Sequence, residues 1–488
     1  MSQSAQLKKR LRSLEAHLSQ ENPILLRAVA SFRKLDKVAQ GLGILERDES
    51  YATQISWWPM VAVLGTYSSG KSTFINHFLG QPLQLTGNQA VDDRFTIVSY
   101  SHEAEGKSLP GLALDADPRF PFFNLSRSIE GIAAGEGRRI DAYLQLKTCR
   151  SEKVRGKILV DSPGFDADAQ RDSTLRITDH IIDLSDLVLV FFDARHPEAG
   201  TMRDTLDHLV ARTINRPDSS KFLYVLNQID TTAREDNPED VIASWQRALA
   251  QKGLIAGRFY RIYNPDAAVP IDDETLRLRY ETKRDVDLDE IHTRMGHVGV
   301  DRAYRVIGVL EQTAQGFLEQ FIPRLQTLLA QWRREVIWLD TLVFGVILTA
   351  VLIWTFWTGT WEGMRFFHPT WSTVWNAPDQ WRYLALGVVF GLISYGHLTL
   401  RRLAARDVLA KLDTELADTT DVLSKSLPQA FLKSTRVWRS IFLRQPAGWG
   451  PGTRRRVSEV QSEANAYVQD LNDRFTDPSG APVDPDAF

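Results

Sequence analysis

Short apolar runs alternate with helix-forming stretches through the first 270 residues, and two long uncharged segments follow later in the chain. Short apolar runs bounded by turn residues are typical of strands that are covered on both faces, as in a parallel sheet. Four such runs occupy residues 60–64, 157–160, 186–193 and 222–227. This pattern predicts an α/β domain with a mostly parallel sheet.

Helical patterns flank this region on both sides. Leu7, Leu11, Leu14 and Leu18 follow the i, i+4, i+7, i+11 spacing of one apolar helix face. We expect this stripe to pack against the protein's own helices, with docking on a membrane surface as the alternative. Further helices are predicted over residues 23–40, 287–331 and 454–475, and a leucine stripe predicts another at 403–427. Gly41 and Gly43 are expected to end the first of these helices, and Pro428 to kink or restart the helix of the leucine stripe.

The two uncharged segments are long enough to cross a membrane. Residues 341–361 and 383–400 contain 21 and 18 residues without a charge, and a spanning helix needs about 17–25 apolar residues. Arginine pairs lie before the first segment (333–334) and after the second (401–402). By the positive-inside rule, both termini are cytoplasmic and the connecting loop is outside. The alternative is a buried helical hairpin in a soluble core.

Composition argues against a nucleic-acid-binding protein and against a disulfide-stabilised one. The chain has 488 residues and a formal charge of −3, which does not favour nucleic acid as a partner. Its single cysteine, Cys149, cannot form an internal disulfide and is expected to be a small buried side chain. The first residues lead into a charged helix, so no cleavable signal peptide is expected.

Candidate chemistry begins directly after the first apolar run. Residues 65–72 are Gly-Thr-Tyr-Ser-Ser-Gly-Lys-Ser, which fits the phosphate-binding pattern G-x-x-x-x-G-K-[ST] between a strand and a helix. Lys71 can reach the β- and γ-phosphates, and the Ser72 hydroxyl can bind Mg²⁺. The expected nucleotide contacts in this loop are Gly65, Ser68, Ser69, Gly70, Lys71, Ser72 and Thr73. The alternative is a chance Gly/Ser loop.

Two further motifs follow later strands. Asp161-Ser162-Pro163-Gly164 places Asp161 where it can hold the magnesium shell and Gly164 where its N–H can meet the γ-phosphate. Asn227-Gln228-Ile229-Asp230 is an N-x-x-D tetrad, expected to read the base through Asn227, Gln228 and Asp230. A carboxylate at Asp230 can accept hydrogen bonds from guanine N1–H and the 2-amino group, so GTP is expected, with ATP as the alternative. The alternative for the tetrad by itself is an ordinary loop at a strand end.

In this order, the three motifs resemble the GTPase-type domain of the dynamin superfamily. Residues 87–95, 105–114 and 117–122 are similar to segments of EHD proteins, which are dynamin-related membrane-remodelling ATPases. The resemblance covers residues 22 to about 317. It implies a G domain flanked by helices from both chain ends, with dimers or higher oligomers forming on a lipid bilayer through the G domain and the stalk. By the same resemblance, Ser68 and the neighbouring Tyr67 are candidates to position the attacking water or to contact a partner across a dimer of G domains. From the motifs themselves, Lys71 and Gly164 are the other catalytic candidates.

The chain departs from the family pattern at several points. Val91 and Asp92 stand where the family has a Thr-Thr pair in switch I, so Asp92 is a third metal-ligand candidate and hydrolysis is less secure than binding. Thr96 can take the place of the missing switch I threonine only if the loop shifts. Gln228 replaces the lysine of Asn-Lys-x-Asp, and no calcium-loop pattern of an EH module follows. The family's membrane-touching tip is expected to be replaced by the spanning hairpin.

Together these features predict six parts and one leading function. The parts are stalk helices (1–56), the G domain (57–270), further stalk helices (271–337), the transmembrane hairpin (338–400), C-terminal stalk helices (401–476) and a disordered tail (477–488). We expect a Mg²⁺-dependent NTPase of the bacterial inner membrane that remodels, tethers or fuses membranes. The alternatives are a non-hydrolysing nucleotide-gated scaffold and a kinase, against which the Asn227–Asp230 tetrad argues.

Overall fold

The fold is that of a computed structural model, which describes residues 3–86, 94–103, 105–117, 120–122, 125–132, 135, 137–164, 172–195, 218–234, 238–254, 258–363, 365–366, 378–416 and 422–475. It comprises two compact units. Unit 1 consists of Met1–Val29, Ala52–Gly308 and Tyr467–Phe488, and unit 2 of Ala30–Tyr51 and Val309–Ala466. We describe each unit by itself.

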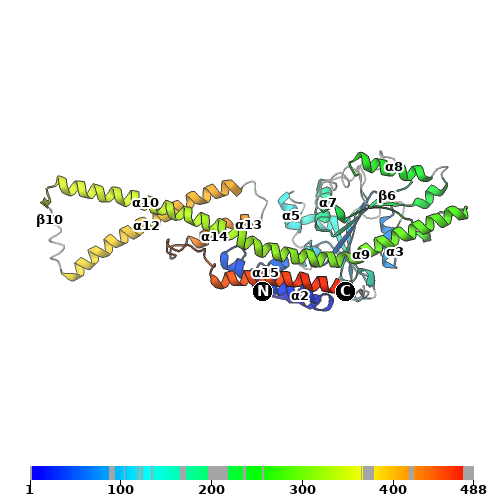
Figure 1. Ribbon diagram of the computed structural model, residues 1–488, viewed down its shortest axis with the longest axis horizontal. Helices are drawn as coiled ribbons and strands as arrows, with labels where there is room; N and C mark the ends of the chain where they lie inside the picture. Colours follow the sequence, from blue (N-terminus) through cyan, green and yellow to red (C-terminus); the bar gives the residue numbers. More distant parts are fainter. Residues whose placement is uncertain are drawn as a thin grey trace. The chain divides into compact units, whose positions relative to one another are not determined.

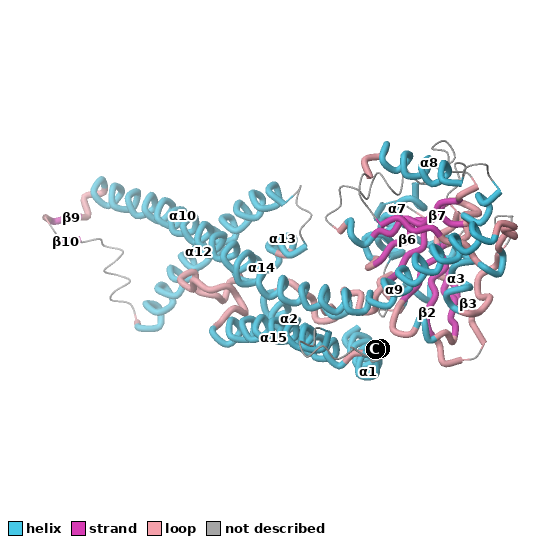
Figure 2. Tube along the Cα trace, turned by 45° about the vertical axis from the view of Figure 1, so that its right-hand side comes forward, coloured by secondary structure: helices cyan, strands magenta, loops and turns pink. Residues whose placement is uncertain are grey.

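Unit 1 contains the predicted sheet. Among the described residues it has eight strands, in the order β3-β4-β2-β5-β1-β6-β7-β8, and Figure 2 shows them in magenta among the helices of this unit. They are β1 (Met60–Gly65), β2 (Phe95–Tyr100), β3 (Ser108–Pro110), β4 (Leu144–Cys149), β5 (Ile158–Asp161), β6 (Leu187–Asp193), β7 (Phe222–Asn227) and β8 (Arg258–Arg261). Only the β2–β5 and β3–β4 pairs are antiparallel within this sheet. The prediction of a mostly parallel α/β sheet is confirmed.

Helices cover both faces of the sheet, which explains the continuous apolar runs. The side chains of β1 alternate: Ala62 and Leu64 join a core with α7 (Asp172–Leu184) and α8 (Pro238–Gln251). Val61 and Val63 join a second core with α3 (Lys71–Leu79) and α9 (Glu274–Gly316). Because every β1 residue is buried, the strand has no polar face.

Four further helices are described in unit 1. They are α4 (Leu112–Ala116), α5 (Leu125–Ile132), α6 (Ile140–Tyr143) and α1 (Gln3–Glu21). In α1, Leu11, Leu14 and Leu18 are buried and Leu7 is half-buried, which agrees with packing inside the protein rather than docking on a membrane surface. Cys149 is buried, as predicted.

Helix α2 runs from Pro23 to Leu42, and it ends two residues later than predicted. Gly41 lies within the helix, whereas Gly43 takes the left-handed conformation that ends it, with φ of +88°. At the other end, the side chain of Asn22 accepts hydrogen bonds from the N–H groups of Ile24 and Leu25 and caps the helix. Part of α2 belongs to each unit.

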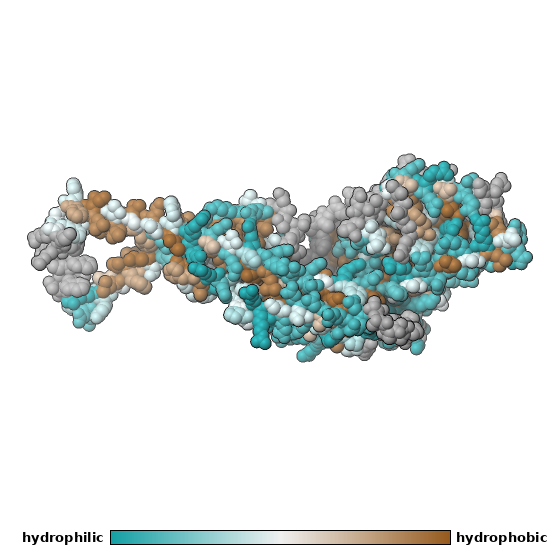
Figure 3. All heavy atoms as spheres, in the orientation of Figure 1, coloured by the Kyte–Doolittle hydropathy of each residue, from teal (hydrophilic) through white to brown (hydrophobic). Residues whose placement is uncertain are grey.

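Unit 2 contains the two apolar helices. Helix α9 continues through a π-helical turn (Phe317–Phe321) into α10 (Ile322–Trp357), and α12 spans Asp379–Leu416. Figure 3 shows brown, apolar side chains along both helices. Of their most apolar 18-residue windows, only 6% and 0% is buried in the structure. Both helices are long and apolar enough to cross a membrane, and a buried hairpin in a soluble core is not what the structure shows.

The first apolar helix ends earlier than predicted. It stops at Trp357 instead of residue 361, because Thr360 turns back to bond the carbonyl of Thr355 and Gly359 takes a φ of +71°. Trp361 instead belongs to a short antiparallel pair of strands, β9 (Trp361–Glu362) and β10 (Arg365–Phe366).

The remaining helices of unit 2 follow α12. They are α13 (Val422–Lys425), α14 (Leu427–Ser434) and α15 (Pro451–Phe475), which ends in unit 1. Pro428 lies in the first turn of α14 and restarts the helix, as predicted. The predicted stripe from residue 403 is wrong at its start, since Leu403 is 59% exposed while Ala404, Val408 and Leu412 are buried.

Candidate nucleotide-binding site

The candidate site residues gather at one edge of the sheet in unit 1. The glycine-rich loop follows β1, Asp161 ends β5, Asp193 ends β6 and Asn227 ends β7. These four strands are neighbours and mutually parallel, so their carboxyl ends lie together. In open α/β sheets this edge is where ligands bind.

Two glycines of the loop are required by their surroundings. Gly65 has a φ of +156°, and a Cβ there would lie 2.5 Å from the carbonyl oxygen of Phe191. Gly70 has a φ of +84°, and a Cβ there would lie 2.2 Å from the amide nitrogen of Asn227. Any other residue would push the loop away from β6 and from the Asn227–Asp230 tetrad.

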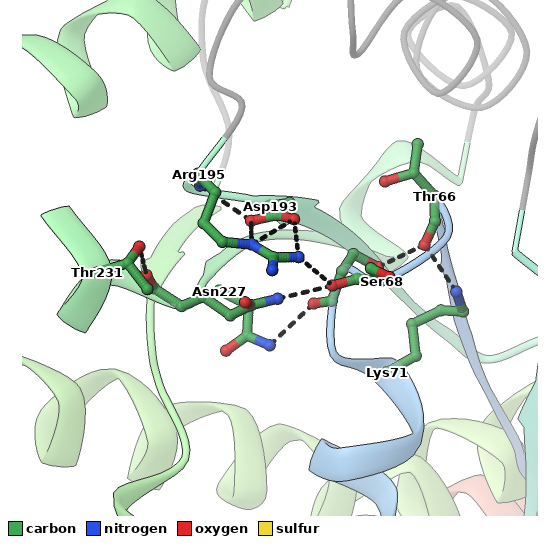
Figure 4. Close-up of polar contacts among 9 residues, drawn as sticks. Thr66, Ser68, Lys71, Asp193, Arg195, Asn227 and Thr231 are labelled. Carbon is green, nitrogen blue, oxygen red and sulfur yellow. Dashed lines mark hydrogen bonds and ion pairs between the residues drawn. The ribbon is translucent and has the colours of Figure 1, made fainter. Parts of the chain in front are cut away.

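Lys71 is buried at the start of α3. Its ammonium donates hydrogen bonds to the carbonyl oxygens of Gly65 (3.1 Å) and Thr66 (2.9 Å), as Figure 4 shows for Thr66. Burial lowers the pKa of Lys71 to about 8, against a smaller opposing effect of Asp161. The loop thus holds a desolvated cation beside the first N–H groups of α3, an arrangement that favours a bound anion. Thr73 lies half-buried in this first turn.

Ser72 and Asp161 form a pair of oxygen donors. The Ser72 hydroxyl donates to the Asp161 carboxylate at 3.1 Å. Gln84 donates to the same carboxylate oxygen, Oδ2, at 2.9 Å and accepts from Lys147 at 2.6 Å, so a second side chain holds Asp161 in place. A hydroxyl and a carboxylate are hard oxygen ligands, which suit Mg²⁺ together with phosphate and water. These two residues therefore fit the predicted metal site, and Gln84 is a supporting residue that the sequence analysis missed.

Gly164 packs against the phosphate-binding loop. A Cβ at this position would lie 2.8 Å from Cα of Tyr67, so only glycine allows the two loops to approach this closely. Ser162 N–H bonds to the carbonyl of Val63 (3.1 Å) and continues the pairing of β5 with β1. The structure therefore brings Gly164 next to the loop, as its predicted role requires.

The tetrad after β7 is tied to the phosphate-binding loop by hydrogen bonds. Asn227 donates to the carbonyl of Ser69 (2.9 Å), and Gln228 donates to the carbonyl of Ser68 (2.7 Å). Both Ser68 and Gln228 have a positive φ, of 57° and 64°, which is uncommon outside glycine. The two strained turns thus hold each other in position.

Asp230 lies in the 3₁₀ turn after the tetrad strand. Its carboxylate is buried and accepts a hydrogen bond from the N–H of Val269 at 2.7 Å. Burial raises the pKa of Asp230, although this hydrogen bond and Arg195 act in the opposite direction. A carboxylate fixed in this way is preorganised to accept from the edge of a base.

Arg195 is a second residue that the sequence analysis missed. Its guanidinium bonds both carboxylate oxygens of Asp193, at 3.0 Å from Nε and 2.6 Å from Nη2, and donates to the Ser68 carbonyl at 3.3 Å (Figure 4). Asp193 and Arg195 therefore brace the same carbonyl that Gln228 contacts. The sequence signal was a pair of opposite charges at the end of the buried strand β6, with Asp193 as its last residue and Arg195 two positions later.

The structure does not test the predicted switch I residues. Val91 and Asp92 lie outside the described residues. Thr96, which was considered a substitute, is buried in β2, where its hydroxyl accepts a hydrogen bond from Gln145 at 2.7 Å. In this structure, Thr96 is therefore engaged within the sheet.

Comparison with known proteins agrees with this geometry. Residues 61–229 match the sequence profile of the Dynamin family. The domain that contains these residues is therefore similar to the Dynamin family. This domain is 30% identical over 182 residues to EH domain-containing protein 1 of Homo sapiens and Bos taurus, and 29% identical to EH domain-containing protein 3 of Rattus norvegicus. The match covers 35% of this chain and 31% of each relative, which is about a third of their length.

Among solved structures, the chain is similar to a member of an oligomerised bacterial dynamin pair, which is described as providing a mechanism for the long-range sensing and tethering of membranes. Identity is 13%, coverage is 96% of this chain and 74% of that one, and the TM-score is 0.33. Era of Aquifex aeolicus, bound to GDP and AlF4⁻, is 16% identical, covers 46% and 56%, and has a TM-score of 0.25. Both TM-scores are below 0.5, so the similarity to the Dynamin family rests on the sequence match of residues 61–229.

Proposed function

We propose that this protein is a membrane-anchored dynamin-type NTPase that binds Mg²⁺ and GTP, hydrolyses the nucleotide and uses the cycle to remodel, tether or fuse membranes. The observation that carries the proposal is the buried Lys71 ammonium inside a phosphate-binding loop, on the same chain as two exposed apolar helices. With both parts on one polypeptide, a change at the nucleotide site can act directly on the bilayer that holds the helices.

The site residues have separate tasks in this proposal. Lys71 and the N–H groups of the loop bind the β- and γ-phosphates and stabilise negative charge that develops on phosphoryl transfer. Ser72 and Asp161 hold Mg²⁺, which neutralises phosphate charge when bound. Gly164 senses the γ-phosphate, and Asp230 selects guanine over adenine by accepting from N1–H and the 2-amino group.

The apolar helices anchor the protein in a bilayer, which we propose to be the bacterial inner membrane. Arg333 and Arg334 before the first span and Arg401 and Arg402 after the second favour a cytoplasmic G domain. Self-assembly on the membrane through the G domain and the neighbouring helices would let many molecules act on one bilayer. Release of the Gly164 contact on hydrolysis is the proposed trigger.

The test is nucleotide turnover by the full-length protein in lipid vesicles. Phosphate release is compared for GTP and ATP, with and without magnesium, for the unchanged protein, Lys71→Ala and Ser72→Ala. We expect Mg²⁺-dependent GTP turnover that both variants abolish, while both keep the far-ultraviolet circular dichroism of the unchanged protein. Equal turnover by Lys71→Ala would contradict the proposal.

A second function is favoured by one feature of the sequence. Val91 and Asp92 occupy the positions at which the resembling family has its switch I threonines, and a carboxylate there would repel the γ-phosphate. On this basis the protein would bind nucleotide without hydrolysing it and would recruit partners as a scaffold. The scaffold would be identified by tight binding of Mg²⁺-GTP without phosphate release in the unchanged protein. In that case Asp92→Thr should introduce phosphate release.

A further inference from the structure

The segment after α14 presents large apolar side chains at the tips of two consecutive turns. The N–H of Arg439 bonds the carbonyl of Arg436 (3.0 Å), and the N–H of Leu443 bonds the carbonyl of Ser440 (3.3 Å). The central positions of these turns are Val437-Trp438 and Ile441-Phe442. Turn centres ordinarily hold Gly, Pro, Asn, Asp or Ser, so this is an unusual placement. We call residues 436–445 the aromatic loop.

The apolar side chains of the aromatic loop face outward. Trp438 is 78% exposed, Phe442 75% and Leu443 55%. The adjoining helix can bury such groups, since Phe431 of α14 is completely buried. A cluster of exposed aromatic residues on one short loop marks an interaction surface.

Arg401 fixes this loop to the end of the second apolar helix. It directly follows the uncharged segment 383–400, and its guanidinium donates to the carbonyls of Arg439 (2.8 Å), Arg436 (3.3 Å) and Val437 (3.3 Å). The same guanidinium lies 5.2 Å from the ring centroid of Trp332 on α10, and the Trp332 indole donates to the Arg401 carbonyl at 3.2 Å. Figure 1 shows α14, from which the loop continues, beside α10 and α12. If residues 383–400 cross a bilayer, the loop therefore lies where the helix leaves it.

The charge around the aromatic loop indicates which kind of partner surface the loop contacts. Between residues 422 and 458 the chain has eight lysines and arginines and no acidic residue. Arg436, Arg439 and Arg444 lie within the loop itself, and Arg436 lies over the ring of Trp438 at 5.5 Å. Basic residues next to exposed tryptophan match the headgroup level of an anionic membrane. A second copy of the same loop would bring like charges together, so self-contact is disfavoured.

We propose that the aromatic loop is a second membrane-contacting element, which inserts Trp438 and Phe442 into the interface of an anionic bilayer beside the second span. This proposal rests on the proposed anchoring by the hairpin. Arg401 is its positioning residue, because it holds three loop carbonyls at the level of the headgroups. Insertion displaces headgroups in the cytoplasmic leaflet only, so each anchored molecule would also act as a shallow wedge.

The test places an environment-sensitive fluorophore on the full-length protein. Buried Cys149 is changed to Ser, and single cysteines are introduced by Phe442→Cys in the loop, Phe390→Cys in the second apolar helix and Glu103→Cys in the G domain. The protein is reconstituted in nanodiscs of phosphatidylcholine, with or without phosphatidylglycerol. Quenching by a nitroxide on the upper acyl chain is compared with quenching by iodide in water.

We expect the Phe442 position to be quenched by the lipid nitroxide and protected from iodide, with a stronger effect when phosphatidylglycerol is present. Quenching by iodide as strong as at the Glu103 position would overturn the proposal. Protection from both quenchers would also overturn it, because a protein surface would then cover the loop. Iodide quenching at the Phe390 position would instead show that the hairpin does not anchor the chain, which separates failure of the proposed function from failure of the loop proposal.

Two variants at Arg401 test its positioning role, with the fluorophore kept at position 442. Arg401→Gln should reduce quenching by the lipid nitroxide several-fold, whereas Arg401→Lys should retain more of it because one ammonium still donates to the loop carbonyls. Nucleotide binding by the G domain and circular dichroism serve as checks on folding. Unchanged lipid quenching in Arg401→Gln would show that Arg401 does not position the loop.

Discussion

The side-chain amide of Gln228 donates a 2.7 Å hydrogen bond to the carbonyl oxygen of Ser68. This contact shows how the chain adapts to a glutamine where the resembling family has a lysine. A lysine at this position would place a charge over the base, whereas the glutamine amide reaches the phosphate-binding loop as a neutral donor. Arg195, held by Asp193, supplies a positive charge to the same carbonyl.

Removing the Gln228 amide is therefore expected to loosen the nucleotide site. Gln228→Ala deletes one hydrogen bond, worth about 0.5–1.5 kcal/mol, so nucleotide affinity should fall by about two- to tenfold. Gln228→Lys, the matched control, also loses the amide but places an ammonium over the base as in the resembling family, so it should keep affinity close to that of the unchanged protein. Titration calorimetry with a non-hydrolysable GTP analogue measures both. Equal affinities for all three proteins would show that this contact does not organise the site.

Asp230 is expected to determine whether the site prefers guanine or adenine. Its carboxylate can accept from both guanine donors, and Asp230→Asn replaces one acceptor with a donor, so guanine should bind about ten- to hundredfold more weakly. Xanthine has a carbonyl where guanine has its 2-amino group, so the variant should gain affinity for xanthosine triphosphate. Competition among GTP, ATP and xanthosine triphosphate measures the change. A preference for ATP that Asp230→Asn leaves unaltered would contradict guanine recognition.

Nucleotide affinity should fall as pH rises through the pKa of Lys71. Burial lowers this pKa to about 8 in the free protein, whereas a bound triphosphate favours the charged ammonium and raises it. Binding therefore takes up a proton above pH 8, and affinity declines by up to about tenfold per pH unit until the pKa of the bound state is reached. Calorimetry in buffers of different ionisation enthalpy counts the protons. Lys71→Met should bind weakly, without this dependence, and the same pH slope in that variant would assign it to another group.

The buried carboxylate of Asp186 is expected to stabilise unit 1. It accepts from the N–H of Met60 (2.9 Å) and pairs with Arg305 (2.8 Å) and with the buried Arg302 (3.4 Å). Asp186→Leu leaves the charge of Arg302 buried without this partner, which costs about 3–5 kcal/mol. Arg305→Ala, at a side chain that is 41% exposed, should cost about 1 kcal/mol or less. Denaturant unfolding compares the two, and equal losses would contradict the dominant role of burial.

The local sequence pattern was sufficient to predict the strands and the phosphate-binding loop. The apolar runs predicted β1, β5, β6 and β7 to within one residue, because strands buried on both faces need continuous apolar sequence. The glycine spacing predicted the loop, because Gly65 and Gly70 adopt positive φ beside other backbone and side-chain atoms. In both cases the physical cause acts over a few residues.

Contacts between distant segments were not predictable in the same way. Gln84 reaches Asp161 across 77 residues and Arg195 reaches Ser68 across 127, and no local spacing signals either pair. The early end of α10 did have a signal, since Gly359 is a helix-stopping residue inside an otherwise apolar segment. The aromatic loop was hidden because exposure, which makes its side chains unusual, is a property of the folded chain.

The arrangement of the hairpin predicts which residues can be labelled from each side of a membrane. With Cys149 changed to Ser, Gly363→Cys introduces a thiol between the two apolar helices and Glu103→Cys introduces one in the G domain. If both spans cross the bilayer with basic residues inside, a membrane-impermeant maleimide added to intact cells should label only position 363. After lysis both positions should react, which controls for accessibility. Labelling of position 103 in intact cells would reverse the orientation, and protection of 363 until lysis would mean that the loop between the helices does not reach the outer side.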